Sequence, residues 1–175
     1  LTRTMENILS MTKIESGADF IDQKREVLED LVYEAEGHIT GLRERRRFSD
    51  SMPEELLTAD VDGRMIIQVL VNLLDNAVKN TEEGGHIRLS VSFQEGKAYF
   101  VVEDDGRGIG PGKEQQIFGE FISLGGKGPD QKHGIGLGLT ICKEVVEAHG
   151  GRIWAENRLE GGARFTFWLN AEVAG

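Results

Sequence analysis

The strongest constraint on the fold of this chain is the amphipathic stretch from Met65 to Thr81. Apolar side chains recur there three and four residues apart, the spacing of one helix face: Met65, Ile66, Val69, Leu70, Leu73, Leu74, Ala77 and Val78. Asp62 is a suitable N-cap, and Gly84 and Gly85 end the pattern. A helix with so broad an apolar stripe has to be covered by a second layer.

Alternating segments predict the strands of that second layer. One hairpin joins Ile87–Phe93 to Ala98–Glu103, and a second joins Arg152–Glu156 to Ala163–Leu169. Helical spacing recurs at 1–16, at 27–42 and at 137–149. The stretch from Ser49 to Asp60, which holds Pro53, indicates an irregular connection with room for a short strand. The sequence therefore predicts an α+β fold, a two-layer sandwich of a mixed β-sheet and helices.

Length and composition limit the class of protein. With 175 residues the chain should form one domain with at most a short appendage. Its net charge of -10 argues against a broad nucleic-acid-binding surface, although a single nucleotide needs only a few local groups. The single cysteine, Cys142, cannot form an intramolecular disulfide, and its apolar neighbours indicate a core position.

The sequence contains no apolar run long enough to span a bilayer and no signal peptide. Because it begins at Leu1, inside a helical pattern, we expect it to be part of a longer protein.

The basic run from Arg43 to Arg47 is interpreted as a solvated helix end, with its cations near the negative end of the dipole, in preference to an anion site. The glycine-rich segment from Ile109 to His133 lacks sustained periodicity, which is typical of a functional lid.

Three polar side chains share one side of the predicted helix. Asn72, Asn76 and Lys79 lie at positions i, i+4 and i+7. An asparagine carbonyl oxygen suits Mg²⁺, which prefers oxygen ligands and accompanies nucleotide phosphates, and a lysine can neutralise a phosphate. Taken alone, the motif would be read as an ordinary solvated helix face.

Two glycine-rich blocks complete the pattern. In DDGRGIG, from Asp104 to Gly110, a carboxylate at a strand end can accept a hydrogen bond from an exocyclic amino group of a base. In GIGLGL, from Gly134 to Leu139, free N–H groups at a helix N-terminus favour an anion. A Rossmann loop is disfavoured, because no helix follows the first block, and the second lacks the ending of a P-loop. The three blocks together predict a site for a magnesium–nucleotide.

The order of these blocks carries a family resemblance. NLLDNAVKNT, DDGRGIG, IFGEF, GIGLGL and EGGARFTF resemble the N, G1, F, G2 and G3 boxes of sensor histidine kinases. Their catalytic ATP-binding domain has the Bergerat fold shared with gyrase-type ATPases. Within the family, the stretches GPGKEQQIFGEF and AHGGRIWAENRLEGGARF are most similar to the Kdp-type potassium-responsive sensor kinases.

The resemblance implies roles for individual residues. Asn76 would hold Mg²⁺, Lys79 would contact phosphate, and Asn72 would support the metal site, in the position where gyrase-type relatives carry a glutamate base. Asp104 would bind the adenine amino group. The other residues implied to contact ATP lie in the turns, the lid, the glycine-rich block and the last strand: Gly106, Gly108, Ile109, Lys132, Gly134, Gly136, Leu137, Gly138 and Thr166. One departure is Asn80, which stands where the family commonly has an aromatic residue.

The segment LTRTMENILSMTKIESG resembles the second helix of the family's dimerisation and phosphoacceptor domain, so we expect residues 1–20 to be its remnant and 21–175 to be the catalytic domain. The phosphoacceptor motif is missing, because none of the four histidines has its surroundings: His38, His86, His133 and His149. The resemblance implies transfer of the ATP γ-phosphoryl group to a histidine outside this chain.

The resemblance also implies partners and a location. The partners would be the chain's own dimerisation domain in a homodimeric full-length protein, and a response regulator. The full-length protein would sit in the bacterial membrane, with this part on the cytoplasmic side. Two alternatives stay open: a stand-alone Bergerat-fold ATPase or serine kinase, and a nucleotide-binding regulatory module without kinase activity.

Overall fold

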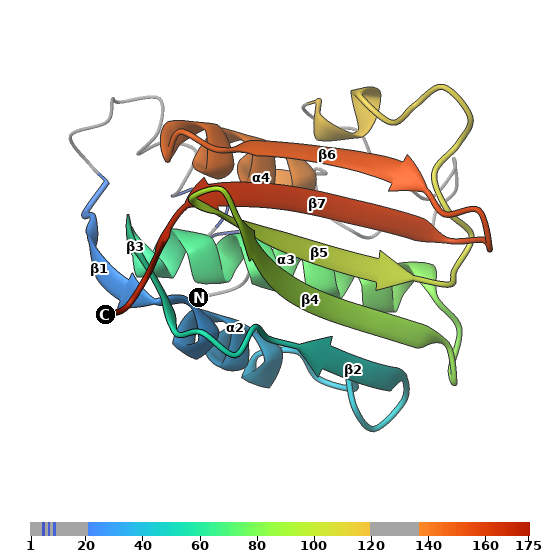
Figure 1. Ribbon diagram of the computed structural model, residues 1–175. Coiled ribbons are helices and arrows are strands. Elements are labelled where there is room, and N and C mark those ends of the chain that lie inside the picture. The colour runs from blue at the N-terminus through green and yellow to red at the C-terminus, as the bar shows by residue number, and fades with distance from the viewer. Residues whose placement is uncertain (1–4, 6, 8, 10–20, 120–136) are drawn as a thin grey trace.

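A five-stranded mixed sheet with helices on one face forms the body of the molecule (Figure 1). The structure is a computed structural model that describes residues 5, 7, 9, 21–119 and 137–175. The strand order is β2-β4-β5-β7-β6, with β2 parallel to β4 and the other pairs antiparallel. The strands span Arg47–Ser51 (β2), His86–Gln94 (β4), Lys97–Asp104 (β5), Arg152–Asn157 (β6) and Ala163–Asn170 (β7). The predicted α+β sandwich is confirmed.

Within residues 21–119 and 137–175, three α-helices cover the sheet, with α3 between the other two (Figure 1). They are α2 (Leu28–Gly37), α3 (Gly63–Asn80) and α4 (Leu137–Ala148), and a short 3₁₀ helix, η2, spans Gln116–Phe118. The N-cap of α3 is Asp62, as predicted, and its side chain accepts a hydrogen bond from the Met65 N–H. The central place of α3 explains its broad apolar stripe, because it packs against both neighbouring helices and the sheet.

The core lies between the sheet and the helices. Alternate residues of β5 and β7 point into it, and the rings of Phe100 and Phe167 stack there with centroids 4.6 Å apart. Cys142 is fully buried and donates a hydrogen bond to the Val69 carbonyl oxygen, which confirms its predicted core position. Burying a large apolar side chain contributes roughly 1.5–3 kcal/mol. This core therefore holds α3 firmly against the strand that ends at Asp104.

A second, three-stranded sheet lies at one end of the molecule, and the sequence reading missed it. Its order is β1-β3-β8, from Lys24–Val27, Leu57–Val61 and Glu172–Val173. The predicted irregular connection at 49–60 is wrong in part, because β2 and β3 lie on either side of Pro53. These strands are short, and each pairs with a segment far away in the sequence, so local alternation did not identify them.

The predicted helix over 27–42 is also too long. The helix ends at Gly37, and Ile39 and Leu42 are buried from the turns that follow, with Gly41 at a φ of +83°. These two residues are apolar because they pack into the core, although they do not belong to a continuous helix. The basic run consequently lies in turns and in β2.

Arg46, within that basic run, caps a different helix from the one expected. Its guanidinium donates hydrogen bonds to the main-chain oxygens of Val78 and Thr81, each at 3.0 Å, and to Thr81 Oγ1 at 2.7 Å. The carbonyls at the C-terminal end of a helix lack partners within that helix. A cation does sit at the negative end of a helix dipole, as expected, but the helix is α3.

The side of the five-stranded sheet opposite the helices carries no second layer of described elements (Figure 1). No helix in the described part of the chain combines the length and apolar character needed to cross a membrane.

A buried carboxyl group lies between α2 and β2. Glu36 Oε1 accepts a hydrogen bond of 2.6 Å from Arg43, whose guanidinium also lies 3.6 Å from Asp50. Glu36 Oε2 is buried and has no hydrogen-bond partner among the described residues. Burial, together with the neighbouring Asp50, raises the pKa of Glu36 to about 7, against the opposing effect of Arg43.

We expect the variant Glu36→Gln to be more stable than the unmodified chain at pH 8 and nearly equal to it at pH 5. An acid whose pKa is raised on folding stabilises the fold below its unfolded pKa, near 4.5, and loses that contribution as the pH rises through about 7. The gain at pH 8 should be on the order of 2 kcal/mol in the free energy of unfolding, measured by chemical denaturation. Glu34→Gln, on the exposed side of the same helix, is the control for net charge. A stability difference that does not change with pH would contradict the assignment.

Candidate functional site

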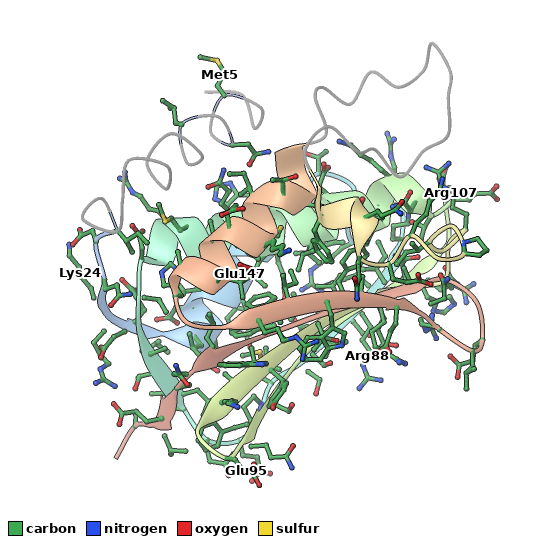
Figure 2. All side chains as sticks on the ribbon, turned by 90° about the horizontal axis from the view of Figure 1, so that it is seen from above. Met5, Lys24, Arg88, Glu95, Arg107 and Glu147 are labelled. Atoms are coloured by element: carbon green, nitrogen blue, oxygen red, sulfur yellow. The ribbon has the colours of Figure 1, made fainter. Side chains whose placement is uncertain are left out.

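The acidic turn begins where β5 ends, at the end of the molecule away from Lys24 (Figure 2). Asp104 is almost fully buried there, and its Oδ1 accepts hydrogen bonds from the N–H groups of Gly106, at 2.9 Å, and Ala163, at 3.4 Å. Burial raises the pKa of Asp104, while these two N–H groups act in the opposite direction. The carboxyl group is therefore held in one orientation by two different strand ends.

Two glycines allow the main chain to pack around Asp104. A Cβ on Gly106 would lie 1.9 Å from the Asn80 carbonyl oxygen, and a Cβ on Gly162 would lie 1.9 Å from the Asp104 carbonyl oxygen. Gly162 also has a φ of +93°, which favours glycine. Gly106 was predicted as a site residue and Gly162 was not. The only sequence signal for Gly162 was its place in the EGGARFTF block.

Asn157 clamps the next part of the turn. Its Oδ1 accepts a hydrogen bond of 2.7 Å from the Ile109 N–H, and its Nδ2 donates one of 2.9 Å to the Ile109 carbonyl oxygen. Gly108 has a φ of +74°, and a Cβ there would lie 2.7 Å from Asn157 Oδ1. The structure therefore brings the predicted residues Gly108 and Ile109 together with a residue that the sequence reading missed. An asparagine at the end of a strand gave no local signal of this contact.

The end of α3 is joined to the same turn through Asn80. Its Oδ1 accepts hydrogen bonds from both Nε, at 3.1 Å, and Nη2, at 2.9 Å, of Arg107, and its main-chain oxygen accepts one from the Arg107 N–H. On the other side, Arg158 donates a hydrogen bond of 2.9 Å to the Asp104 carbonyl oxygen. Asn80, where the resemblance implied an aromatic residue, holds the acidic turn against α3.

The polar face of α3 leads from this turn towards α4. Asn72 is buried, and its Nδ2 donates a hydrogen bond of 3.3 Å to the Gly138 carbonyl oxygen in the first turn of α4. One turn further, Asn76 Nδ2 is buried without a hydrogen-bond partner among the described residues. A ligand oxygen would remove the energetic cost of that unpaired group. Lys79 is half-exposed and forms an ion pair of 2.8 Å with Asp75.

Part of the predicted glycine-rich block can be placed. Leu137 is the first residue of α4, and Gly138 lies beside Asn72, with room for ordinary contact. Thr140 in α4 donates a hydrogen bond of 2.9 Å to the Gly119 carbonyl oxygen, just after η2. Lys132, Gly134 and Gly136 lie outside the described residues, as does most of the predicted lid. Among the described residues, no three His, Cys, Asp or Glu side chains are grouped so that they could hold a metal ion.

Thr166 does not join the other predicted residues. It lies on β7 opposite Val101 of β5, whereas Phe165 and Phe167 beside it point into the core. Because side chains alternate along a strand, Thr166 lies on the face of the sheet away from the helices, and Asp104 lies on the helix side. Its predicted place in the nucleotide site stays a prediction, and Gly162 is the residue of the same block that lies against Asp104.

The family model for histidine kinase-, DNA gyrase B- and HSP90-like ATPases matches residues 61–173, which include α3, the acidic turn, α4 and the last long strand. The chain belongs to this family of ATP-binding domains. The resemblance to histidine kinase catalytic domains is thereby confirmed.

Individual proteins agree with this membership. The chain is 39% identical over 173 residues to the sensor protein KdpD of Clostridium acetobutylicum, covering 99% of the chain and 19% of that protein. It therefore spans about a fifth of that relative. The catalytic domain of histidine kinase ThkA is 30% identical with a TM-score of 0.72, covering 85% of this chain and 95% of that one. Full-length ShkA in complex with AMPPNP is 25% identical with a TM-score of 0.77, covering 97% and 35%.

We expect Asn157→Ala to lower the free energy of unfolding by about 1–3 kcal/mol, because it leaves the buried Ile109 main-chain groups without partners. Chemical denaturation measures the change, and hydrogen exchange should show faster exchange of the Ile109 amide. The control is Asn170→Ala at the exposed end of β7, which should stay within about 0.5 kcal/mol. A variant at position 157 that behaves like this control would refute the clamp.

Proposed function

We propose that this chain is the catalytic, ATP-binding part of a sensor histidine kinase and that it transfers the γ-phosphoryl group of ATP to a histidine on a dimerisation helix outside the chain. The observation that carries the proposal is the buried Asp104 carboxyl group. It is fixed by two main-chain N–H groups, and neighbouring glycines let the surrounding main chain pack closely around it. This arrangement suits a flat base with an exocyclic amino group.

In this proposal the adenine amino group donates a hydrogen bond to Asp104. Gly106 and Gly108 lie in the turn that follows, and their lack of side chains lets that turn pack against Asn80 and Asn157 beside the proposed base site. Asn157 keeps that turn in shape through Ile109. The complex of the related ShkA with AMPPNP, an ATP analogue, is consistent with a purine nucleotide as the ligand.

The phosphates would extend along the polar face of α3 towards the start of α4. The unpaired Asn76 Nδ2 can donate a hydrogen bond to a phosphate oxygen, and the carbonyl oxygen of the same amide is the atom proposed to hold Mg²⁺ with the nucleotide. When bound, Mg²⁺ would neutralise the charge of the phosphate oxygens. Lys79 would leave Asp75 for a phosphate, and Asn72 would keep the first turn of α4 in place through Gly138.

Catalysis in this proposal rests on positioning and charge neutralisation. A ring nitrogen of the acceptor histidine forms a bond to the γ-phosphorus, while the bond from that phosphorus to the β–γ bridging oxygen breaks. ADP leaves with the electron pair. Asn72 has no basic group that could activate water, so the site favours transfer to a histidine over hydrolysis.

By likeness to the sensor kinases, the phosphoryl group would then pass to a response regulator, and the full-length protein would be a membrane-bound homodimer.

We expect Mg²⁺–ATP to raise the thermal midpoint of the chain, and Asn76→Ala or Asp104→Ala to abolish most of the rise. At a ligand concentration one hundred times the dissociation constant, binding adds about 2.7 kcal/mol, which corresponds to roughly 5–10 °C. Differential scanning fluorimetry with and without EDTA measures the effect. Ser92→Ala, on an exposed position of β4, is the control and should keep the full rise. Full binding by either site variant would show that the residue assignments are wrong.

We also expect this chain alone to acquire no acid-labile phosphate from γ-labelled ATP, because no histidine in it has the surroundings of an acceptor. A longer chain that includes the upstream helix should be labelled on a histidine of that helix. Autoradiography after acid and base treatment distinguishes phosphohistidine from phosphoserine. Acid-labile label on the present chain, or acid-stable label on the longer one, would contradict the proposed reaction.

A further inference from the structure

A cluster of three amide side chains, two of them buried, joins Asn7 to α3. Asn7 is 6% exposed, and its Oδ1 accepts hydrogen bonds from Gln68 Nε2, at 2.6 Å, and from Asn72 Nδ2, at 3.1 Å. Residue 7 lies 61 and 65 positions away from these donors in the sequence. Met5, Asn7 and Leu9 are the described residues of the N-terminal segment, and Met5 lies on the helix side of the molecule (Figure 2).

The cluster continues into the first turn of α4. Asn72 Nδ2 donates both to Asn7 and to the Gly138 carbonyl oxygen, and an amide group has two hydrogens to give. Both hydrogens are therefore used, and the direction of the Asn72 Oδ1 atom is fixed. One helical turn further, on the same face, lies Asn76 with its unpaired amide nitrogen.

Burying the Asn7 amide costs free energy of desolvation, which would be unnecessary if the contact served only to hold this segment in place. An apolar residue could pack at the same position without desolvating an amide, whereas Met5 and Leu9 on the same segment keep about half of their surface exposed. A buried amide needs its partners in one arrangement, so it specifies orientation more than it adds stability. The group that Asn7 orients is Asn72.

We infer that Asn7 is a positioning residue, whose contact with α3 is coupled to nucleotide binding through Asn72 and Gly138. When Asn7 is in place, the Asn72 amide is aligned and the first turn of α4 is held where the phosphates are proposed to lie. Without it, Asn72 can rotate, and the affinity for the nucleotide falls. Because such coupling is reciprocal, the nucleotide in turn strengthens the contact between Asn7 and α3. The inference rests on the proposed function.

The test is the affinity of the chain for Mg²⁺–AMPPNP, measured by isothermal titration calorimetry. Asn7→Leu keeps the branched shape of the side chain and removes the acceptor, and it should weaken binding about threefold to tenfold, the size of one lost hydrogen bond. Leu9→Ala, two residues away and half-exposed, is the matched control and should bind like the unmodified chain. Asn7→Ser, with a shorter side chain, replaces Asn7→Leu if the latter alters the circular dichroism spectrum.

A double-mutant cycle distinguishes positioning from general packing. If Asn7 acts through Asn72, adding Asn7→Leu to Asn72→Ala should cause no further loss of affinity. Equal or tighter binding by Asn7→Leu, or a full additive loss in the double variant, overturns the inference. Failure of the unmodified chain to bind Mg²⁺–AMPPNP would instead overturn the proposed function, so the two failures are distinguishable.

Discussion

The site depends on two places where main chain meets main chain with no room for a side chain. At the end of β5, Gly106 lies against the carbonyl of Asn80, and Gly162 lies against the carbonyl of Asp104. These contacts join the end of α3, the end of the central strand and the hairpin that leads into β7. A single carbon atom added at either glycine would clash with the facing carbonyl group. The close contact of the three elements therefore requires glycine at both positions. The orientation of the Asp104 carboxyl group follows from that contact.

Polar side chains then complete what the two glycines begin. Asn80 holds Arg107, and Asn157 holds Ile109, so the acidic turn is anchored to a helix on one side and to a strand on the other. The Asn80 side chain binds the guanidinium group of Arg107. The Asn157 side chain binds the N–H and carbonyl groups of Ile109, which have no partner in a sheet or helix. The turn therefore keeps a defined shape without regular secondary structure of its own.

Local patterns were enough to predict α3, both long hairpins and the α+β class, because apolar periodicity records which face of an element is buried. The small sheet was missed, since β1, β3 and β8 are short and their partners are remote in the sequence. The same reason hid Asn157 and Gly162, whose roles arise from contacts between distant elements. Thr166 lies on the other face of the sheet from Asp104, and a motif shared with a family does not state which face of the strand each residue occupies. Asn80, a departure from the family pattern, proved to be an anchor.

Both ends of α3 are tied to other parts of the molecule. At its start, the Asp62 side chain accepts hydrogen bonds from Met65 and Asp22, and the Asp62 N–H donates to His149 Nε2. At its end, Arg46 binds the last carbonyls. Helix ends commonly fray, and ordering them on binding costs conformational entropy. In this helix that entropy is lost when the protein folds, so side-chain rotation is the main freedom that Asn72, Asn76 and Lys79 would still lose on binding the proposed nucleotide.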